Sequence, residues 1–363
     1  MAGRKKKSAG RMPLWLYVLI VVAIALVTYF RTSGEAEAGD PQPPAASAAA
    51  QQTPADETLT VCFLDVGQGD SILLACGDET MLIDGGPVEE GQFLVSRLNR
   101  LDVTGLTYVI NTHPDEDHCG GLAAVLAKYP AEHVYSSVTE YTTKVFSNVV
   151  KYADEQGHPV EVPQTGDSWT LGSACVQVIG PVQTYSDPNN GSLVLRVDYG
   201  GTSFLFTGDM EQNAEADLMD SGANVRADVL KVGHHGSPTS SSEALLEAVA
   251  PSIAVISVGE DNDYGHPSAD VLARLEALGT TIYRTDTQGE IIITSDGQTL
   301  TVTTDPTSRE PAAGKDAPFI GNRNSMIVHS ANCAKLPGED NRVYFNTAEE
   351  AEEYGYQKHT CIK

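Results

Sequence analysis

Three apolar, strand-like segments of this chain each end in histidine or aspartate side chains, and this pattern restricts the fold more than any other feature. The segments are residues 106–110 before THPDEDHCGG (112–121), residues 204–207 before Gly208 and Asp209, and residues 229–232 before Gly233, His234 and His235. Loops at the ends of buried strands are where functional side chains collect. The sequence therefore predicts a sheet-based fold with a polar site at its strand ends.

The run from residue 112 to 121 carries the strongest chemical signal. Four candidate metal ligands, His113, Asp115, Asp117 and His118, fall within six residues. Carboxylates and imidazoles at this spacing, packed at a turn between a strand and a helix, can converge on one or two cations. A solvated acidic loop whose aspartates cap the following helix is the alternative interpretation. The two histidines that flank the carboxylates favour the metal site.

Predicted strands and helices alternate through residues 58–305, which we interpret as one α/β domain. The strands fall into two groups with helices between them, and this arrangement predicts two packed sheets covered by helices. Strands are expected at residues 60–65, 71–76, 81–84, 106–111, 176–179, 193–199, 202–207, 229–232, 254–258, 281–284 and 290–294, and helices at 90–101, 120–128, 213–221, 241–249 and 269–278.

Six motifs in this domain resemble those of the metallo-β-lactamase-fold hydrolases, and in particular the soluble domain of the ComEC family of DNA-uptake proteins. In the family's order they are LDVGQGDSI (64–72), LIDGG (82–86), THPDEDHCGG (112–121), LFTGD (205–209), KVGHHGS (231–237) and YGHPS (264–268). The resemblance implies a four-layer αββα metallo-β-lactamase sandwich that acts as a metal-dependent hydrolase. DNA uptake itself is not implied, since these residues do not include that family's multi-span channel.

The resemblance also implies which residues bind metal. The family's first motif is His-x-His-x-Asp-His, and here Asp115 stands where the second histidine is usual. A further family histidine, before the Gly-Asp motif, is replaced by NNGS (189–192). One metal position therefore has harder oxygen ligands, which favour Mn²⁺ or Mg²⁺ over Zn²⁺ there. The implied ligands are His113, Asp115, Asp117, His118, Asp209 and His235, with His266 as the alternative to His235, and Asp84, Asn190 and Ser192 are expected to support them.

The implied chemistry is hydrolysis of a phosphodiester by a metal-activated water. Asp209 would bridge two divalent cations, which lower the pKa of a water between them and stabilise the developing charge. The expected catalytic residues are Asp117, His234 and His266, and either histidine is a candidate to protonate the leaving oxygen. The candidate phosphate contacts are Lys231 and Ser237. For Lys231, a solvated lysine beside a strand is an equally good interpretation.

Charge restricts the substrate. The chain carries 49 Asp and Glu against 23 Lys and Arg, a formal charge of −26, so a long polyanion is repelled unless a basic groove or divalent ions intervene. We expect a phosphodiesterase or nuclease acting on DNA or a wall polymer, with no indication of an obligate protein partner. A choline-phosphate esterase acting on cell-wall teichoic acid is the alternative, because such enzymes share the DVGQGD opening. A non-catalytic surface binding protein is the alternative of another class.

The first 57 residues predict a membrane anchor. Residues 1–13 are rich in Lys and Arg, and residues 14–30 are apolar and uncharged. This length is at the short end of what crosses a bilayer, and the basic flank places the head in the cytoplasm and the body outside. Residues 31–57 predict a disordered linker. A signal peptide cleaved near AEA (36–38) is the alternative, which would make the protein secreted rather than a single-pass protein of the cell membrane.

Residues 319–363 predict a small α+β module that follows a linker at 306–318. Its nitrogen and sulfur donors, four in number as a structural Zn²⁺ requires, are His329, Cys333, His359 and Cys361. A module of so few residues usually needs a bound metal or a disulfide to fold stably. A Cys333–Cys361 disulfide without metal is the alternative. The module resembles the small metal-binding module of the Ada DNA-repair protein, although HTC (359–361) replaces the usual Cys-x-x-Cys.

Overall fold

The computed structural model of the chain describes residues 57–309, here called the body, and residues 313–362, here called the tail module. The predicted basic head and membrane anchor, and all but the last residue of the predicted linker 31–57, lie outside the described residues. Within the described ranges, no helix is both long enough and apolar enough to cross a membrane.

The elements of the body alternate as the sequence pattern predicts. Its strands are β1 (Leu59–Phe63), β2 (Ile72–Cys76), β3 (Glu79–Ile83), β4 (Leu106–Asn111), β5 (Ala131–Ser136), β6 (Ser168–Leu171), β7 (Ala174–Gly180), β8 (Val194–Tyr199), β9 (Thr202–Phe206), β10 (Val229–Lys231), β11 (Ile253–Ile256), β12 (Thr281–Arg284), β13 (Glu290–Ser295) and β14 (Leu300–Asp305). Its helices are η1 (Val88–Glu90), α2 (Gly91–Arg100), α3 (Glu116–Cys119), α4 (Leu122–Lys128), α5 (Lys144–Glu155), α6 (Gln212–Asp220), η2 (Gly233–Gly236), α7 (Glu243–Val249), α8 (Ala269–Ala277) and α9 (Thr285–Gln288).

The strands form two mixed seven-stranded sheets. The first has the order β14-β13-β1-β2-β3-β4-β5 and is antiparallel except where β4 pairs in parallel with β3 and β5. The second has the order β12-β11-β10-β9-β8-β7-β6 and is parallel from β9 to β12. Parallel neighbours end at one edge of a sheet, so the loops after β3 and β4 lie together, as do those after β9, β10 and β11.

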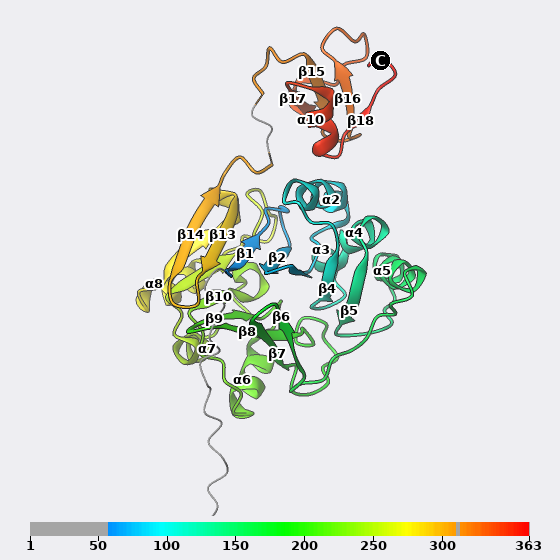
Figure 1. The fold of residues 1–363 in the computed structure, drawn as a ribbon. Helices are drawn as coiled ribbons and strands as arrows, with labels where there is room; N and C mark the ends of the chain where they lie inside the picture. Colours follow the sequence, from blue (N-terminus) through cyan, green and yellow to red (C-terminus); the bar gives the residue numbers. More distant parts are fainter. Residues whose placement is uncertain (1–56, 310–312, 363) are drawn as a thin grey trace, which may run out of the picture. The chain divides into compact units, whose positions relative to one another are not determined.

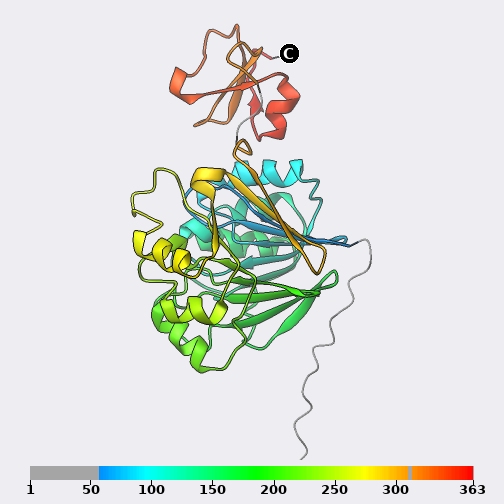
Figure 2. The ribbon, with the colours of Figure 1, turned by 90° about the vertical axis from the view of Figure 1, so that its left-hand side faces the viewer.

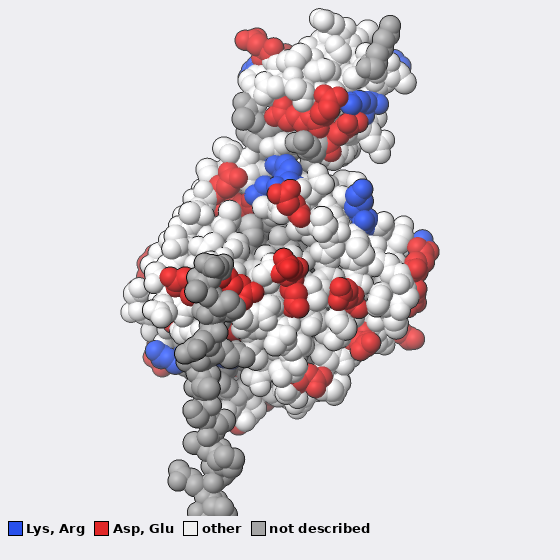
Figure 3. All heavy atoms as spheres, in the orientation of Figure 1, with Lys and Arg blue, Asp and Glu red and all other residues white. Residues whose placement is uncertain are grey.

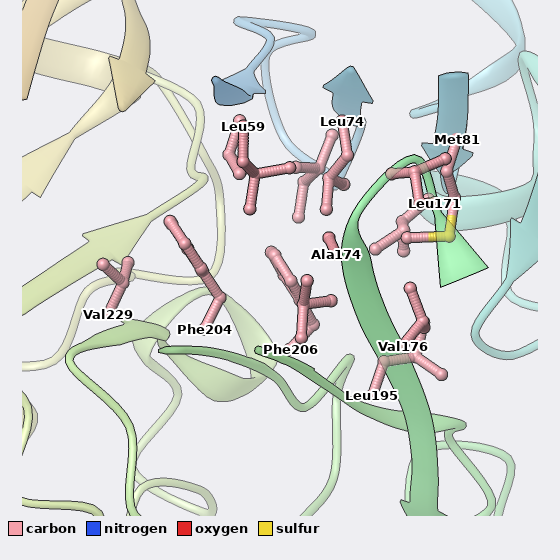
Figure 4. Packing of buried hydrophobic residues seen from close by; sticks show 14 of the residues in the cluster. Leu59, Leu74, Met81, Leu171, Ala174, Val176, Leu195, Phe204, Phe206 and Val229 are labelled. Atoms are coloured by element: carbon pink, nitrogen blue, oxygen red, sulfur yellow. The ribbon is translucent and has the colours of Figure 1, made fainter. Parts of the chain in front are cut away.

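The two sheets pack face to face, and helices cover the outer face of each (Figures 1 and 2). Strand alternation sends Val61 and Phe63 into the core between the sheets and Cys62 toward the outer helices. In Figure 4, Leu74 of the first sheet and Phe206 of the second are among the side chains of this shared core. Helices α2, α4 and α5 pack behind the first sheet, and α6, α7 and α8 behind the second. The body is therefore a four-layer αββα sandwich, which confirms this part of the predicted fold.

The sequence pattern does not predict the strands β5, β6 and β14, the helix α5, or the short helices η1, α3, η2 and α9. The three strands are edge strands of their sheets, and alternate residues of β6 and β14 face solvent. An edge strand of this kind carries a weak apolar signal, because its pattern resembles that of a polar loop.

The tail module is a small α+β unit, as predicted. Its sheet has the order β17-β15-β16-β18, and β16 and β18 are parallel. Thr347 and Glu350 form a capping box at the start of its helix. The elements are β15 (Phe319–Asn322), β16 (Ile327–Ser330), η3 (Glu339–Asn341), β17 (Arg342–Phe345), α10 (Ala348–Glu353) and β18 (Gln357–Lys358). Its buried hydrophobic cluster is Val328, Val343, Phe345, Ala351 and Tyr356.

Candidate metal centre

Asp84 follows β3 and orients the histidine delivered by the neighbouring strand. It is fully buried, with a positive φ of 58°. Its Oδ1 accepts the backbone N–H of Thr112 at 2.7 Å, and its Oδ2 accepts the Thr112 hydroxyl at 2.6 Å. The same Oδ2 lies 2.8 Å from Nδ1 of His118. Because the carboxylate only accepts, Nδ1 of His118 carries the proton and Nε2 is left with a lone pair.

His235 is oriented in the same way from the second sheet. It follows β10 with φ of 53°, next to His234 with φ of 51°, so two consecutive non-glycine residues have left-handed backbone. Such conformations persist where the surrounding structure imposes them, often at functional sites. Nδ1 of His235 lies 2.9 Å from the carbonyl oxygen of Ser257. A carbonyl also only accepts, so Nε2 of His235 has a lone pair as well.

These two lone pairs meet between two carboxylates. Nε2 of His118 lies 3.3 Å from Nε2 of His235. Oδ1 of Asp209 is 3.2 Å from the first nitrogen, and Oδ2 of Asp117 is 3.2 Å from the second. One ligand atom from each of these four residues, here called the four-residue cluster, lies within 4.8 Å of the others. When both rings are neutral, with the proton on Nδ1, neither Nε2 offers a hydrogen to the other, and a cation between them satisfies all four groups.

Protons compete with a cation for this position. Burial opposes charge on His235, but Asp209, Asp117 and Asp70 outweigh it and raise its pKa to about 10. Burial likewise opposes charge on His118, and Asp209 and Asp84 raise its pKa well above the ordinary value. The site therefore attracts positive charge strongly, and a divalent ion binds there by displacing protons.

A second, less complete position lies beside His113. This ring is fully buried, and burial together with the nearby His118 lowers its pKa to about 4, so the ring is neutral. Its Nε2 is buried without a hydrogen-bond partner in the described part of the chain, and Asp209, whose Oδ1 contacts His118 at 3.2 Å, is the nearby carboxylate that could also reach it. Oδ2 of Asp115 is 3.8 Å from that nitrogen, and the Asp115 side chain is 41% exposed. An unpartnered buried nitrogen beside two carboxylates fits a second cation, held by fewer and more exposed ligands than the first.

Residues 64–260 match the family described as the metallo-beta-lactamase superfamily. The chain belongs to this superfamily.

Two curated relatives within the superfamily resemble this chain over about two thirds of its length. ComE operon protein 3 of Bacillus subtilis is 32% identical over 250 residues, which are 64% of this chain and 32% of that protein. Competence protein ComA of Neisseria gonorrhoeae is 34% identical over 239 residues, 65% of this chain and 32% of that protein. The chain thus spans about a third of the length of these relatives. The crystal structure of the metallo-beta-lactamase fold protein YhfI from Bacillus subtilis superposes with a TM-score of 0.43 at 12% identity, covering 68% of this chain and all of that one.

The superfamily resemblance left His235 and His266 open as ligands, and the structure separates them. His235 lies in the four-residue cluster, whereas His266 packs edge-on against His234 with ring centroids 5.7 Å apart. Nε2 of His234 is 3.7 Å from Oδ2 of Asp209, and its Nδ1 is 3.5 Å from Oε1 of Glu211. The His234 side chain is 23% exposed. His234 is therefore partly exposed beside Asp209, and His266 packs against His234 without joining the four-residue cluster.

Of the predicted supporting residues, Ser192 lies at the site and Asn190 lies one layer away. The Ser192 hydroxyl accepts the backbone N–H of Asp209 at 3.1 Å and is 3.4 Å from Nδ1 of His113. The Asn190 side chain donates to Glu211 at 3.4 Å and accepts a backbone N–H at the start of α6. Ser192 therefore positions ligands directly, whereas Asn190 acts through Glu211.

The predicted phosphate contacts need correction. Lys231 is buried, and its Nζ lies 2.6 Å from Oδ2 of Asp70 and 2.9 Å from the carbonyl oxygen of Val232. Ser237 is 4% exposed, and its hydroxyl is 2.9 Å from that of Thr239. Lys231 ends a central strand, so its side chain points into the protein. Neither side chain is open to a phosphate, and Lys231 is not a solvated lysine either.

Sequence reasoning missed Asp70 and Glu211. Asp70 is buried, its Oδ1 is 3.3 Å from Nδ1 of His235, and Lys231 outweighs burial to hold its pKa well below the usual range. The LDVGQGDSI motif contains Asp70 and was the signal available for it. Glu211 contacts His234 and accepts the Thr239 hydroxyl at 2.7 Å, and no motif marks it.

A cavity of about 460 Å³ is lined by sequence neighbours of His113 and Ser192, and none of the candidate metal ligands lines its wall. Its wall includes Pro114, next to His113, and Gly191 and Leu193, which flank Ser192. Further lining residues are Tyr141, Tyr185 and Asp187, and the wall contains neither Lys nor Arg. Figure 3 shows acidic side chains over the visible face of the body, with fewer basic ones. This cavity therefore suits a neutral or positively charged group better than a run of phosphates.

Proposed function

We propose that this protein is a metal-dependent phosphodiesterase. The observation that carries the proposal is the pair of facing imidazole nitrogens, 3.3 Å apart, between the carboxylates of Asp117 and Asp209. Asp117, His118, Asp209 and His235 would hold one Zn²⁺ or Mn²⁺ ion. His113, Asp115 and Asp209 would hold a second, for which their oxygen ligands favour Mn²⁺ or Mg²⁺.

When bound, such ions supply Lewis acidity that lowers the pKa of a water and stabilises charge on a phosphate oxygen. The chain itself supplies the proton for the leaving oxygen. His234 is partly exposed at the edge of the cluster, and Glu211 faces its Nδ1 at 3.5 Å. With Nδ1–H held by Glu211, the protonated ring can donate from Nε2. His266 packs on His234 and limits its rotation.

The charge of the protein and the lining of the cavity favour a phosphodiester substrate that the protein contacts through only a few phosphates. A nuclease would have to hold DNA through few phosphates, because the formal charge is −26 and the cavity wall lacks Lys and Arg. A choline-phosphate ester of a wall polymer is the second candidate, and Tyr141, Tyr185 and Asp187 in the cavity wall favour it. Aromatic faces and a carboxylate are the groups that bind quaternary ammonium.

The proposed location follows from the sequence. Residues 14–30 would anchor the protein as a single-pass protein of the cell membrane, with the hydrolase outside and the basic residues 1–13 in the cytoplasm. Cleavage of this segment would release the hydrolase as a secreted protein.

The function is tested by a turnover screen of the purified chain with Mn²⁺, Zn²⁺ or Mg²⁺. The substrates are bis(p-nitrophenyl) phosphate, a single-stranded oligonucleotide and p-nitrophenyl phosphorylcholine. Asp209→Ala should abolish metal-dependent turnover, whereas Asp154→Ala, an exposed carboxylate on α5, should leave it unchanged. Metal bound without turnover of any ester would refute the enzyme and favour the non-catalytic binding protein.

A further inference from the structure

The tail module brings its four nitrogen and sulfur donors to one edge of its sheet. β16 and β18 are parallel, with Ile327 opposite Gln357 and Val328 opposite Lys358. Parallel strands end at the same edge, so the segments that follow them meet there. His329 lies at the end of β16, and His359 directly follows β18, where its backbone N–H donates to the carbonyl of Val328 at 2.9 Å. Topology therefore places HSANC (329–333) beside HTC (359–361).

The side chains from these two segments converge on one point. One donor atom from each of His329, Cys333, His359 and Cys361 lies within 4.8 Å of the others. Sγ of Cys333 is 3.4 Å from Nδ1 of His329 and 3.7 Å from Nδ1 of His359. The two imidazole rings stack with centroids 4.3 Å apart. Two nitrogens and two sulfurs around a common centre are the ligand set of a tetrahedral zinc site.

The surroundings of both sulfurs suit thiolates. The backbone N–H of Ser330 points at Sγ of Cys361 at 3.4 Å, and that of Lys335 points at Sγ of Cys333 at 3.5 Å. Amide donors of this kind stabilise the negative charge of a sulfur that binds metal. Both cysteines are free thiols in the structure, so the predicted alternative, a Cys333–Cys361 disulfide, is not what the structure contains.

A bound metal would also stabilise the tail module, whose hydrophobic core is small. The hydrophobic cluster of the tail module has five buried members, two of which are aromatic. Units of this size rarely fold on such a core alone and are usually held by disulfides or a metal. A structural zinc ion links the ends of β16 and β18 and can supply a large share of the folding free energy.

We propose that His329, Cys333, His359 and Cys361 bind one structural zinc ion, separate from the metal centre of the body. The soft thiolate pair selects Zn²⁺ over Mg²⁺ or Mn²⁺, so the tail site and the second position of the body differ in metal preference. All four ligand positions are filled by the protein, as in sites that stabilise a fold.

The test uses the full-length chain, purified under reducing conditions and reconstituted with Co²⁺ in place of zinc. Thiolate ligands give bound Co²⁺ a sulfur-to-metal charge-transfer absorption, which the four-residue cluster of the body, with only nitrogen and oxygen ligands, does not produce. We expect this absorption in the wild-type chain. Cys333→Ser should abolish it and lower bound zinc by one ion per chain, whereas Cys175→Ser, a matched free cysteine in the body, should change neither.

Two further variants guard against an effect of misfolding. His359→Cys keeps four ligands and should retain one zinc with a stronger charge-transfer absorption. Asp209→Ala should leave the absorption intact, which makes the result independent of the proposed hydrolase. A folded wild-type chain without thiolate absorption, or one in which peptide mapping finds Cys333 bonded to Cys361, would overturn the zinc site.

Discussion

At the scale of single residues, the metal centre depends on a buried chain of charges that no ligand motif reveals. The Lys231 ammonium is bonded to Asp70, and Asp70 faces the protonated Nδ1 of His235. Lys231→Met should therefore leave a buried carboxylate without its cation and lower the free energy of unfolding by about 3–5 kcal/mol. Urea denaturation measures this. Lys128→Met, at an exposed lysine, should change it by less than about 0.5 kcal/mol.

The double variant Asp70→Asn, Lys231→Met removes both charges and should be less destabilised than Lys231→Met alone. If Lys231→Met lowers the free energy of unfolding no more than Lys128→Met does, the ion pair between Lys231 and Asp70 contributes little to stability.

Asp84 is a residue whose removal should weaken metal binding without removing a ligand. Asp84→Asn replaces the carboxylate that holds the Nδ1–H of His118 with an amide, so the orientation of that ring is less well defined. We expect about a 10–100-fold loss of metal affinity, measured by competition with a chromogenic chelator. Asp102→Asn is a matched control, since Asp102 also has a positive φ but is exposed. Equal affinities of the two variants would exclude the orienting role.

The protonation of His235 predicts how metal binding and stability depend on pH. Burial lowers its pKa, but Asp209 and the neighbouring carboxylates raise it to about 10 in the metal-free protein. Its pKa is higher folded than unfolded, where it is near 6.5. Its contribution to the stability of the metal-free chain is therefore complete below about pH 6.5 and is lost as the pH rises toward 10.

Metal affinity should change in the opposite sense, rising about tenfold per pH unit over this window for each proton displaced. Calorimetric titrations with Mn²⁺ in buffers of different ionisation enthalpy count the protons released. Metal binding without release of protons would contradict the proposed competition between protons and the metal ion.

At the scale of elements, two parallel strand pairs and one close backbone contact bring the ligands together. Asp84 and the 112–121 motif meet because β3 and β4 are parallel, and Asp209 and His235 meet because β9 and β10 are. The α3–α4 turn is fixed against the first sheet at Gly121, whose backbone N–H donates to the carbonyl of Gly86 at 2.9 Å. A Cβ at Gly121 would lie 2.2 Å from the carbonyl oxygen of Gly85, so no side chain fits there.

Gly121→Ala should therefore shift α3, which carries Asp117 and His118. We expect a loss of about 1–3 kcal/mol in unfolding free energy together with weaker metal binding, measured by denaturation and metal titration. Gly338→Ala is the control, because its backbone φ is −58° and a Cβ there meets nothing within 4 Å. An alanine at 121 with wild-type stability and affinity would show that the turn can move without cost to the site.

At the scale of the whole molecule, the formal charge of −26 predicts an unusual response to salt. If the enzyme cleaves single-stranded DNA, raising NaCl from about 50 to about 200 mM should raise kcat/KM, because screening weakens repulsion between two polyanions. The small diester bis(p-nitrophenyl) phosphate is the control and should respond much less. A fall in kcat/KM for DNA, as for basic nucleases, would indicate a cationic groove that the described surface does not suggest.

Local pattern was enough to predict the sandwich and the short motif that supplies His113, Asp115, Asp117 and His118, because buried strands and metal ligands both leave dense signals in sequence. The tertiary arrangement of the strands decided which of the other candidate residues lie at the metal centre. Only packing across β10 and β11 shows that His235 rather than His266 joins the cluster, and that Lys231 is bonded to Asp70. Those contacts join residues far apart in the chain, and a single sequence records no trace of such distances. In the tail module the sequence already suggested the four donors, and the parallel pairing of β16 with β18 is what brings their side chains within reach of one another.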